Sequence, residues 1–216
     1  MRIAIATVAA IIFSTLPAWS TPIPKSDLSK FARVHGKSAP PYGYVQFCVS
    51  RPKHCRGDGK TFSRVKATKA RLNELDYVNR QVNKAIKPVE DREQYGVEEY
   101  WTIPTTGMGD CEEYVLVKRQ RLIDDNWPTG ALLITVVLDE NRQGHAVLTA
   151  RTSVGDLILD NKHDDIKLWS KTPYTYIMRQ SYLNPNVWLS LAPAGNVGTN
   201  PTAGTPNNSW TPRTKP

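Results

Sequence analysis

The chain has 216 residues, a formal net charge of +8 at neutral pH and three cysteines. Beyond its first twenty residues, no segment approaches the roughly 18 uninterrupted apolar residues of a membrane-spanning helix, so we expect no membrane span. The charge is unevenly distributed, because residues 51–87 hold eleven Lys and Arg against three acidic residues and residues 88–113 hold one Arg against eight acidic residues. The basic part falls on a predicted amphipathic helix, which favours a solvated face over a binding surface, and we expect no nucleic-acid partner.

The two ends of the chain differ in composition from the segment between them. Residues 1–20 begin with Arg2, continue with an apolar run and end in Ala18-Trp19-Ser20, which is typical of a signal peptide. Residues 192–216 are rich in Pro, Gly, Asn and Thr without an apolar period, which predicts a disordered tail. We therefore expect one domain over residues 21–191 in a periplasmic or secreted protein.

The cysteines indicate one disulfide and one free thiol. In an oxidising compartment an even pair is expected to bridge, and the short segment FCVSRPKHC makes Cys48 and Cys55 the natural partners. Cys111 is then left over. An unpaired thiol in an exported protein is either a reactive group or a buried, inert side chain.

The first half of the domain is predicted to be helical. Within residues 61–91, apolar side chains recur at steps of three and four up to Pro88, which predicts an amphipathic helix. Residues 95–110 carry the glycines and prolines of a loop, and residues 111–127 again follow a helical pattern. Asp110 is a suitable N-cap for this second helix, and acidic residues are favoured in its first turn.

The second half is predicted to form strands. Residues 131–138 are an apolar, β-branched run, and residues 145–151 and 157–160 are two further short strands separated by TSVGD. Residues 168–191 are rich in aromatics and suggest one last strand or an irregular packing segment. Helices followed by an antiparallel meander indicate an α+β domain, with the N-terminal helices packed on the sheet.

Three residues in this order suggest nucleophilic catalysis. Cys111 lies at a helix start, His145 at the head of one strand and Asp160 at the tail of the next, so the two strand residues should meet at the open end of a hairpin. A slip of one residue would bring Asn161 to His145 instead. A thiol needs a base, and the base needs a partner that orients it. Zinc is disfavoured, because these three ligands lack a paired C-x-x-C or H-x-x-x-H element.

Two acids flank the thiol, although negative charge should hinder thiolate formation. Helix capping accounts for them structurally, and the positive end of the helix dipole would favour the thiolate. Because adjacent residues on a helix do not share a face, we expect Cys111 to face the cleft while Asp110 and Glu112 project elsewhere.

The motifs WTIPTTGMGDCEEYVLVK, QGHAVLTA and LILDN, in this order, resemble the bacterial transglutaminase-like cysteine proteinases. This group contains periplasmic proteases that clip large adhesins from the cell surface. The similarity runs from about Gly43 to Leu191, and FCVSRPKHC also resembles members of the group. The final segment YTYIMRQSYLNPNVWLSL departs from the adhesin-clipping branch, so the resemblance leaves the adhesin substrate and the regulatory receptor of that system open.

The resemblance implies a papain-like, transglutaminase-like fold and peptide-bond hydrolysis, with Cys111 as nucleophile, His145 as base and Asp160 as the orienting acid. It also implies calcium binding through the acids that match Asp110 and Glu112, for which oxygen ligands are suited. No other cofactor is required for this chemistry. The expected substrate is a protein or peptide, with a cell-surface protein as one candidate.

The leading hypothesis is thus an exported cysteine peptidase that forms an acyl-enzyme. The backbone amide of Cys111 is a candidate oxyanion donor, and Gln94 or the indole of Trp101 could supply a second. The same triad would also serve a transglutaminase or amidase that transfers the acyl group to an amine. A third alternative is a non-enzymatic module that holds an anionic envelope polymer with its basic helix and aromatic loop.

Overall fold

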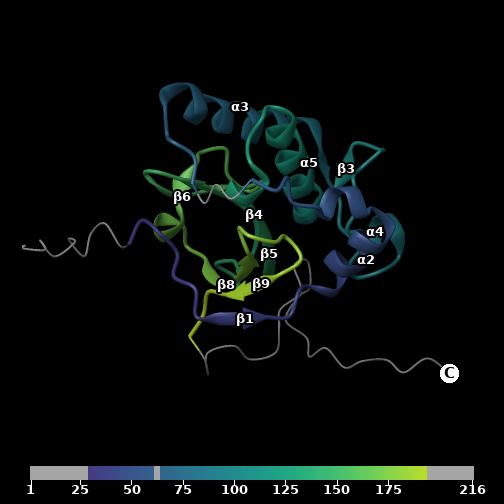
Figure 1. Ribbon diagram of the computed structural model, residues 1–216. Helices are drawn as coiled ribbons and strands as arrows, with labels where there is room; N and C mark the ends of the chain where they lie inside the picture. The colour runs from purple at the N-terminus through teal and green to yellow at the C-terminus, as the bar shows by residue number, and fades with distance from the viewer. Residues whose placement is uncertain (1–28, 61–63, 194–216) are drawn as a thin grey trace, which may run out of the picture.

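The computed structural model describes residues 29–60 and 64–193 (Figure 1). The α-helices are α2 (Tyr42–Ser50), α3 (Lys69–Ala85), α4 (Asp91–Tyr95) and α5 (Cys111–Asp124), and the 3-10 turns are η1 (Pro52–Cys55), η2 (Thr129–Ala131) and η3 (Trp169–Lys171). The strands are β1 (Gly36–Ser38), β2 (Lys87–Pro88), β3 (Met108–Gly109), β4 (Leu132–Leu138), β5 (Gly144–Thr152), β6 (Gly155–Leu159), β7 (Lys167–Leu168), β8 (Thr175–Gln180) and β9 (Trp188–Ser190). The expected signal peptide lies outside the described residues, and so does the expected tail apart from residues 192 and 193.

One antiparallel sheet organises the molecule. Its strand order is β1-β9-β8-β4-β5-β6-β7, with β4 between β5 and β8. Helix α5 packs against β4 and β5, and α3 packs on α5, so the two long helices lie together on one side of the sheet (Figure 1). The prediction of an α+β domain with helices packed on an antiparallel sheet is confirmed.

Helix α3 forms where the apolar periodicity predicts it. It begins after Thr68, whose hydroxyl accepts a hydrogen bond of 3.2 Å from the Arg71 backbone N–H. Leu75, Val78 and Val82 are buried against the core, and the burial of three such side chains supplies several kcal/mol. The helix ends at Ala85, and Pro88 already lies in β2.

The hairpin of β5 and β6 sets the geometry of the site. Thr152 pairs with Gly155, so the turn falls within the predicted TSVGD segment. Gly155 has φ of +146°, and a Cβ there would lie 2.3 Å from Leu168 Cδ2, so a side chain is excluded. Leu148 pairs with Leu159. This register places the start of β5 and the residues after β6 at the same end of the hairpin.

The C-terminal and N-terminal segments are more regular than the sequence suggested. Residues 168–191 contain two strands of the main sheet, because β8 pairs with β4 and β9 pairs with β8. Strand β1 then pairs with β9 at the sheet edge. The predicted loop over residues 95–110 also holds β3, which pairs in parallel with β2. These strands depend on partners distant in sequence, which local patterns do not reveal.

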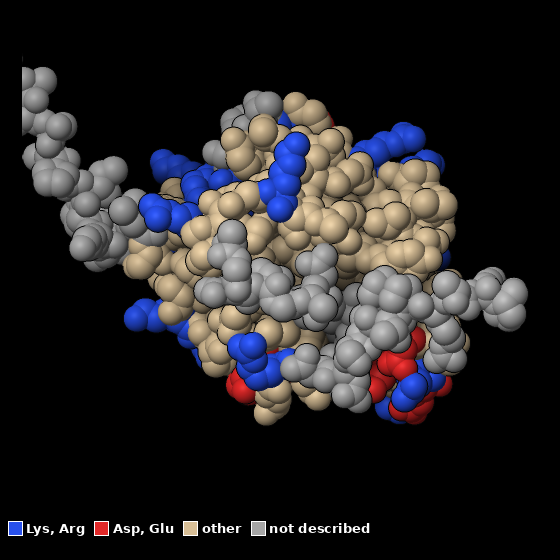
Figure 2. Space-filling model, turned by 90° about the horizontal axis from the view of Figure 1, so that it is seen from below, with Lys and Arg blue, Asp and Glu red and all other residues tan. Residues whose placement is uncertain are grey.

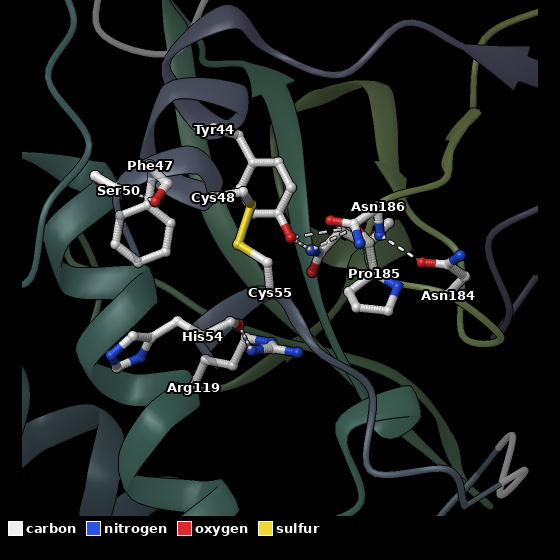
Figure 3. The surroundings of a disulfide bond; sticks show 11 residues. Tyr44, Phe47, Cys48, Ser50, His54, Cys55, Arg119, Asn184, Pro185 and Asn186 are labelled. Carbon is white, nitrogen blue, oxygen red and sulfur yellow. Dashed lines mark hydrogen bonds between the residues drawn. A yellow bond between two sulfur atoms is a disulfide. The ribbon is translucent and has the colours of Figure 1, made fainter. Parts of the chain in front are cut away.

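A disulfide joins Cys48 of α2 to Cys55 of η1, which confirms the predicted pairing (Figure 3). The guanidinium of Arg119, from α5, donates a hydrogen bond of 3.2 Å to the backbone carbonyl of His54. Arg119 also donates to the Leu132 carbonyl at 3.1 Å. The disulfide loop is therefore connected to the helix that carries Cys111.

Three arginines of the basic stretch form ion pairs with acidic residues. Arg64 pairs with Asp156 at 2.7 Å, Arg71 with Glu74 at 2.7 Å, and Arg80 with Asp76 at 3.1 Å. The ion pairs of Arg71 and Arg80 favour the solvated-face interpretation of the basic helix. Figure 2 shows the molecule from below, on the side away from α3, and on this face the Lys and Arg side chains are scattered.

No helix in the described part of the chain is both long enough and apolar enough to cross a membrane.

Candidate active site

Cys111 is the first residue of α5, and its position is fixed by a capping box. Asp110 is the N-cap, and Glu113 Oε2 accepts a hydrogen bond of 3.0 Å from the Asp110 backbone N–H. A Cβ at Gly109 would lie 2.6 Å from Glu113 Cβ, so only glycine allows this close approach. The prediction of a helix start at Cys111 with Asp110 as N-cap is confirmed.

The Cys111 thiol is buried and faces Glu112, not away from it. Sγ donates a hydrogen bond of 2.9 Å to Glu112 Oε2, and Glu112 is fully buried. The expectation that Glu112 projects elsewhere is therefore wrong, because its long side chain folds back alongside its neighbour. Burial raises the pKa of the Cys111 thiol well above its usual range, and the negative charge of Asp110 adds to this effect.

The backbone of β5 reaches the thiol as well. The Ala146 N–H donates a hydrogen bond of 3.3 Å to Cys111 Sγ, which places the start of β5 beside the start of α5. His145 is the preceding residue. The cysteine and the histidine, 34 positions apart in the sequence, thus lie at the same point of the fold.

His145 and Asp160 form a buried pair. His145 Nε2 lies 2.9 Å from Asp160 Oδ1, and the two side chains are 2 % and 4 % exposed. If the β5–β6 pairing continued past Leu159, Val147 would lie opposite Asp160. His145 lies two residues before Val147, on the same face of the strand, and is therefore a diagonal neighbour of Asp160. The predicted proximity at the open end of the hairpin is confirmed. Asn161, the alternative partner, is not bonded to His145.

The ionisation of Asp160 is held by its hydrogen bonds. Burial alone would raise its pKa, but the hydrogen bond and charge of His145 and the Tyr174 hydroxyl lower it to about 2. The Lys162 backbone N–H donates a further hydrogen bond of 3.0 Å to Oδ1. Asp160 is therefore a carboxylate at neutral pH. Because Nε2 of His145 faces this carboxylate, Nδ1 is the ring nitrogen left for proton transfer.

An open cleft of about 420 Å³ gives access to these side chains. Asp110, Cys111 and His145 line it, and the other lining residues are Pro88, Val89, Glu90, Glu93, Asp139, Gln143, Gly144, Asn161 and Lys162. The expectation that Asp110 projects away from the cleft is therefore also wrong. Lys162 Nζ and Asp139 Oδ2 form an ion pair of 2.6 Å that joins the β4–β5 turn to the loop after β6.

Neither side chain suggested as a second oxyanion donor lines this cleft. The Gln94 amide donates to the Tyr95 hydroxyl and the Thr106 hydroxyl, each at 3.0 Å. Trp101 is 3 % exposed and packs edge-on against Tyr44 in the core. Both suggestions are wrong. The Cys111 N–H lies in the first turn of α5, where backbone amides have no intrahelical acceptor.

Five acidic side chains gather around the start of α5: Asp91, Glu99, Asp110, Glu112 and Glu113. Burial, followed by the charge of Asp110, raises the pKa of Asp91 to about 7. Burial likewise raises the pKa of Glu99 to about 8 and that of Glu113 to about 9. Within the described residues none of the five takes part in an ion pair. Carboxyl groups are thus concentrated here without a compensating Lys or Arg, and these raised pKa values favour the protonated, neutral form at neutral pH.

Several carboxylate oxygens of this cluster are buried and have no hydrogen-bond partner in the described part of the chain. They are Asp91 Oδ1, Asp110 Oδ1 and Glu112 Oε1. The Trp101 indole interacts with the Glu99 carboxylate and lowers the pKa of that group, against the larger effect of burial. Oxygen atoms of Asp91, Asp110 and Glu113 lie within 4.8 Å of one another, as do ligand atoms of Asp110, Cys111 and Glu112. Unpaired, convergent carboxylate oxygens fit a hard cation such as Ca²⁺.

Sequence reasoning missed several residues of the site. Tyr174 and the Lys162 amide contact Asp160, and Asp91 and Glu99 extend the acidic cluster. Asp91 and Glu99 belong to the acidic stretch that the charge distribution revealed, but only the fold brings them to the thiol. Tyr174 belongs to an aromatic-rich segment in which no regular spacing of residues indicates that this side chain approaches Asp160.

Three solved structures of LapG from Legionella pneumophila match this chain. The calcium-bound form is 22% identical over 62% of this chain and 77% of that chain, with a TM-score of 0.49. A second structure is 25% identical over 57% and 71% of the two chains, with a TM-score of 0.47. The EGTA-treated form is 24% identical over 58% and 69%, with a TM-score of 0.47. No curated protein sequence gave a match.

The sequence profile of the bacterial transglutaminase-like cysteine proteinases, BTLCP, matches residues 34–196. This range covers most of the chain, including both long helices and all strands of the main sheet. The chain therefore belongs to the bacterial transglutaminase-like cysteine proteinase family and is a cysteine peptidase.

Proposed function

We propose that this protein is an exported cysteine peptidase that hydrolyses peptide bonds through Cys111, His145 and Asp160. The observation that carries the proposal is the buried His145–Asp160 hydrogen bond of 2.9 Å next to a residue, Ala146, whose amide is bonded to Cys111 Sγ. A nucleophile, a base and an orienting acid are thereby available within one cleft. The family supplies the class of reaction.

In the proposed mechanism the resting enzyme holds a neutral thiol. Nδ1 of His145 takes the thiol proton when the side chain turns from Glu112 toward the imidazole, and Asp160 stabilises the imidazolium that forms. The thiolate attacks the peptide carbonyl, and the Cys111 N–H donates to the developing oxyanion. The imidazolium then protonates the leaving amine, and water hydrolyses the acyl-enzyme.

We further propose that Asp110 and Glu112 bind calcium, with Asp91 and Glu99 as further candidate ligands from the preceding segment. The unpaired carboxylate oxygens support this proposal. When bound, the ion would supply positive charge that offsets the carboxylates beside the thiol. Asp110 and Glu112 would then hold the ion, while the chemistry on the peptide remains with the other three residues.

The compartment and the substrate are inferred from the sequence. We propose that residues 1–20 are removed on export to the periplasm or the medium, and the disulfide is consistent with an oxidising compartment. A protein exposed on the cell surface is the substrate we expect there. The mass of the protein purified from the extracellular or periplasmic fraction should correspond to a chain that begins at Thr21, and an uncleaved chain retained in the cytoplasm would contradict export.

Hydrolysis and acyl transfer to an amine can be distinguished by the product that the acyl group forms. Purified enzyme is incubated with a library of peptides and a fluorescent primary amine, with and without calcium. A hydrolase releases free carboxylic acids, whereas a transglutaminase incorporates the amine. We expect released acids from the wild type and none from Cys111→Ala. Amine incorporation as the main product would favour the transglutaminase or amidase alternative.

A further inference from the structure

Asp160 is held by donors on both of its carboxylate oxygens. Oδ1 accepts hydrogen bonds from His145 Nε2 at 2.9 Å and from the Lys162 N–H at 3.0 Å. Oδ2 accepts a hydrogen bond from the Tyr174 hydroxyl. Among the described residues, Tyr174 is the one group that holds Oδ2. Without it, rotation of the carboxylate would be limited from one side alone.

Tyr174 contacts the base as well as the acid. It lies between η3 and β8, is 8 % exposed, and its ring packs edge-on against His145 with 5.6 Å between the ring centroids and 71° between the planes. One side chain thus fixes the carboxylate by its hydroxyl and limits tilting of the imidazole by its ring.

We propose that Tyr174 is a positioning residue that holds Asp160, and through it His145, in the orientation needed for proton transfer. This inference rests on the proposed function of Cys111, His145 and Asp160. A buried carboxylate that loses one donor keeps its charge at a higher cost and is held less firmly against rotation. The imidazole then samples orientations in which Nδ1 no longer faces the thiol, and proton transfer depends on that alignment.

Tyr176 provides a matched control. It follows Tyr174 by two residues, is 7 % exposed and belongs to the same buried cluster. Its hydroxyl, however, is hydrogen-bonded to the Thr172 hydroxyl at 3.0 Å and not to Asp160. Tyr174→Phe and Tyr176→Phe therefore each remove one buried hydroxyl from the same region, and only the first removes it from the carboxylate.

The experiment compares the two variants with the wild type by two readouts. The first is inactivation by a peptidyl vinyl sulfone, resolved into the maximal rate kinact and the concentration for half-maximal rate KI. The second is the NMR signal of the His145 Nε2-bound proton in ¹⁵N-labelled protein, assigned by its absence in His145→Gln. Thermal unfolding is measured in parallel, and we expect the two variants to unfold at similar temperatures.

We expect kinact to fall on the order of tenfold in Tyr174→Phe with KI changed less than about twofold, together with a displaced Nε2-proton signal. Tyr176→Phe should match the wild type in both readouts. Equal kinact values in the two variants, or a signal that stays in place in Tyr174→Phe, would overturn the proposal. If the wild type does not react with the vinyl sulfone, the proposed peptidase mechanism fails, and the NMR comparison still decides whether Tyr174 positions the pair.

Discussion

Lys118 is a charged residue enclosed in the helical layer. It is fully buried in α5, its Nζ lies 5.7 Å from the centre of the Tyr114 ring, and it has no hydrogen-bond partner in the described part of the chain. Burial lowers the pKa of Lys118 from 10.5 to about 7, although the charges of Asp160 and Asp164 oppose the shift. The ammonium form therefore destabilises the folded protein.

Replacing Lys118 by methionine tests this effect. Between pH 7 and pH 10 the unfolded chain keeps the Lys118 proton and the folded chain does not. The free energy of unfolding of the wild type therefore rises by about 1.4 kcal/mol for each pH unit in this range because of this residue. In Lys118→Met this contribution is absent, and at pH 6 the free energy of unfolding of the variant should exceed that of the wild type by about 4 kcal/mol. Urea unfolding at several pH values measures it.

Lys84→Met is the control for the Lys118 prediction, because Lys84 is exposed near the end of α3. It should leave the pH dependence of the free energy of unfolding unchanged. Parallel pH profiles for the wild type and Lys118→Met would show that the folded protein keeps the Lys118 proton as readily as the unfolded chain.

At the residue scale, the sequence was sufficient to identify the side chains with distinctive chemistry. Cys111 stood out as the unpaired cysteine, and hairpin logic paired His145 with Asp160, as the hydrogen bond between them confirms. Sequence reasoning failed for Glu112, because the helical position of a residue does not determine how a long side chain bends. It could not find Tyr174, which approaches Asp160 only through the order of strands in the sheet.

The start of helix α5 is the element on which the site depends. Gly109 allows the Glu113 side chain to fold over the N-cap, and Glu113 Oε1 also accepts a hydrogen bond of 3.0 Å from the Thr102 N–H. This connects the helix to the segment that precedes it. Disturbing Gly109 should therefore affect both the helix start and the acidic cluster.

We predict that Gly109→Ala lowers the free energy of unfolding by roughly 1–3 kcal/mol, because the new methyl group would lie 2.6 Å from Glu113 Cβ. Gly57→Ala is the control, since a Cβ there would meet its nearest neighbour at 3.7 Å. Chemical denaturation measures both. Equal stabilities of the two variants would mean that the capping box accommodates the new methyl group without a loss of folding free energy.

At the scale of elements, the sequence predicted those that carry a complete local signal. Helices α3 and α5 lie within the predicted segments. In the hairpin, β5 extends the predicted strand 145–151 by one residue at each end, and β6 begins two residues before the predicted 157–160. Strands β1 and β9 are each three residues long, and they pair with each other although they are far apart in the sequence. Neither strand therefore has a local sequence pattern from which it could be predicted.

The acidic cluster links distant parts of the whole molecule. Asp91 follows β2, Glu99 lies in the connection to β3, and Asp110 and Glu112 begin α5. Because the pKa values of Asp91, Glu99 and Glu113 are raised, the stability they contribute is present below about pH 4 and is lost as the pH rises through about 7 to 9. A bound divalent cation would oppose this loss.

We therefore predict that calcium raises the thermal unfolding temperature, and raises it more at pH 8 than at pH 5. Asp110→Asn and Glu112→Gln should reduce the increase, whereas Glu140→Gln, an exposed acid in the β4–β5 turn, should preserve it. Differential scanning fluorimetry with calcium, magnesium or EGTA provides the measurement. An unfolding temperature that calcium does not change at pH 8 would contradict a calcium site here.

The central claim is that Cys111, His145 and Asp160 act together on a peptide carbonyl. The most direct measurement is mass spectrometry of the protein after reaction with a peptidyl vinyl sulfone, followed by peptide mapping. We predict one adduct, on Cys111, in the wild type and in His163→Ala, whose side chain is exposed in the same loop as Asp160. The adduct should be absent in Cys111→Ala and strongly reduced in His145→Ala and Asp160→Asn. An adduct on another residue, or undiminished labelling of Cys111 in His145→Ala, would contradict the account.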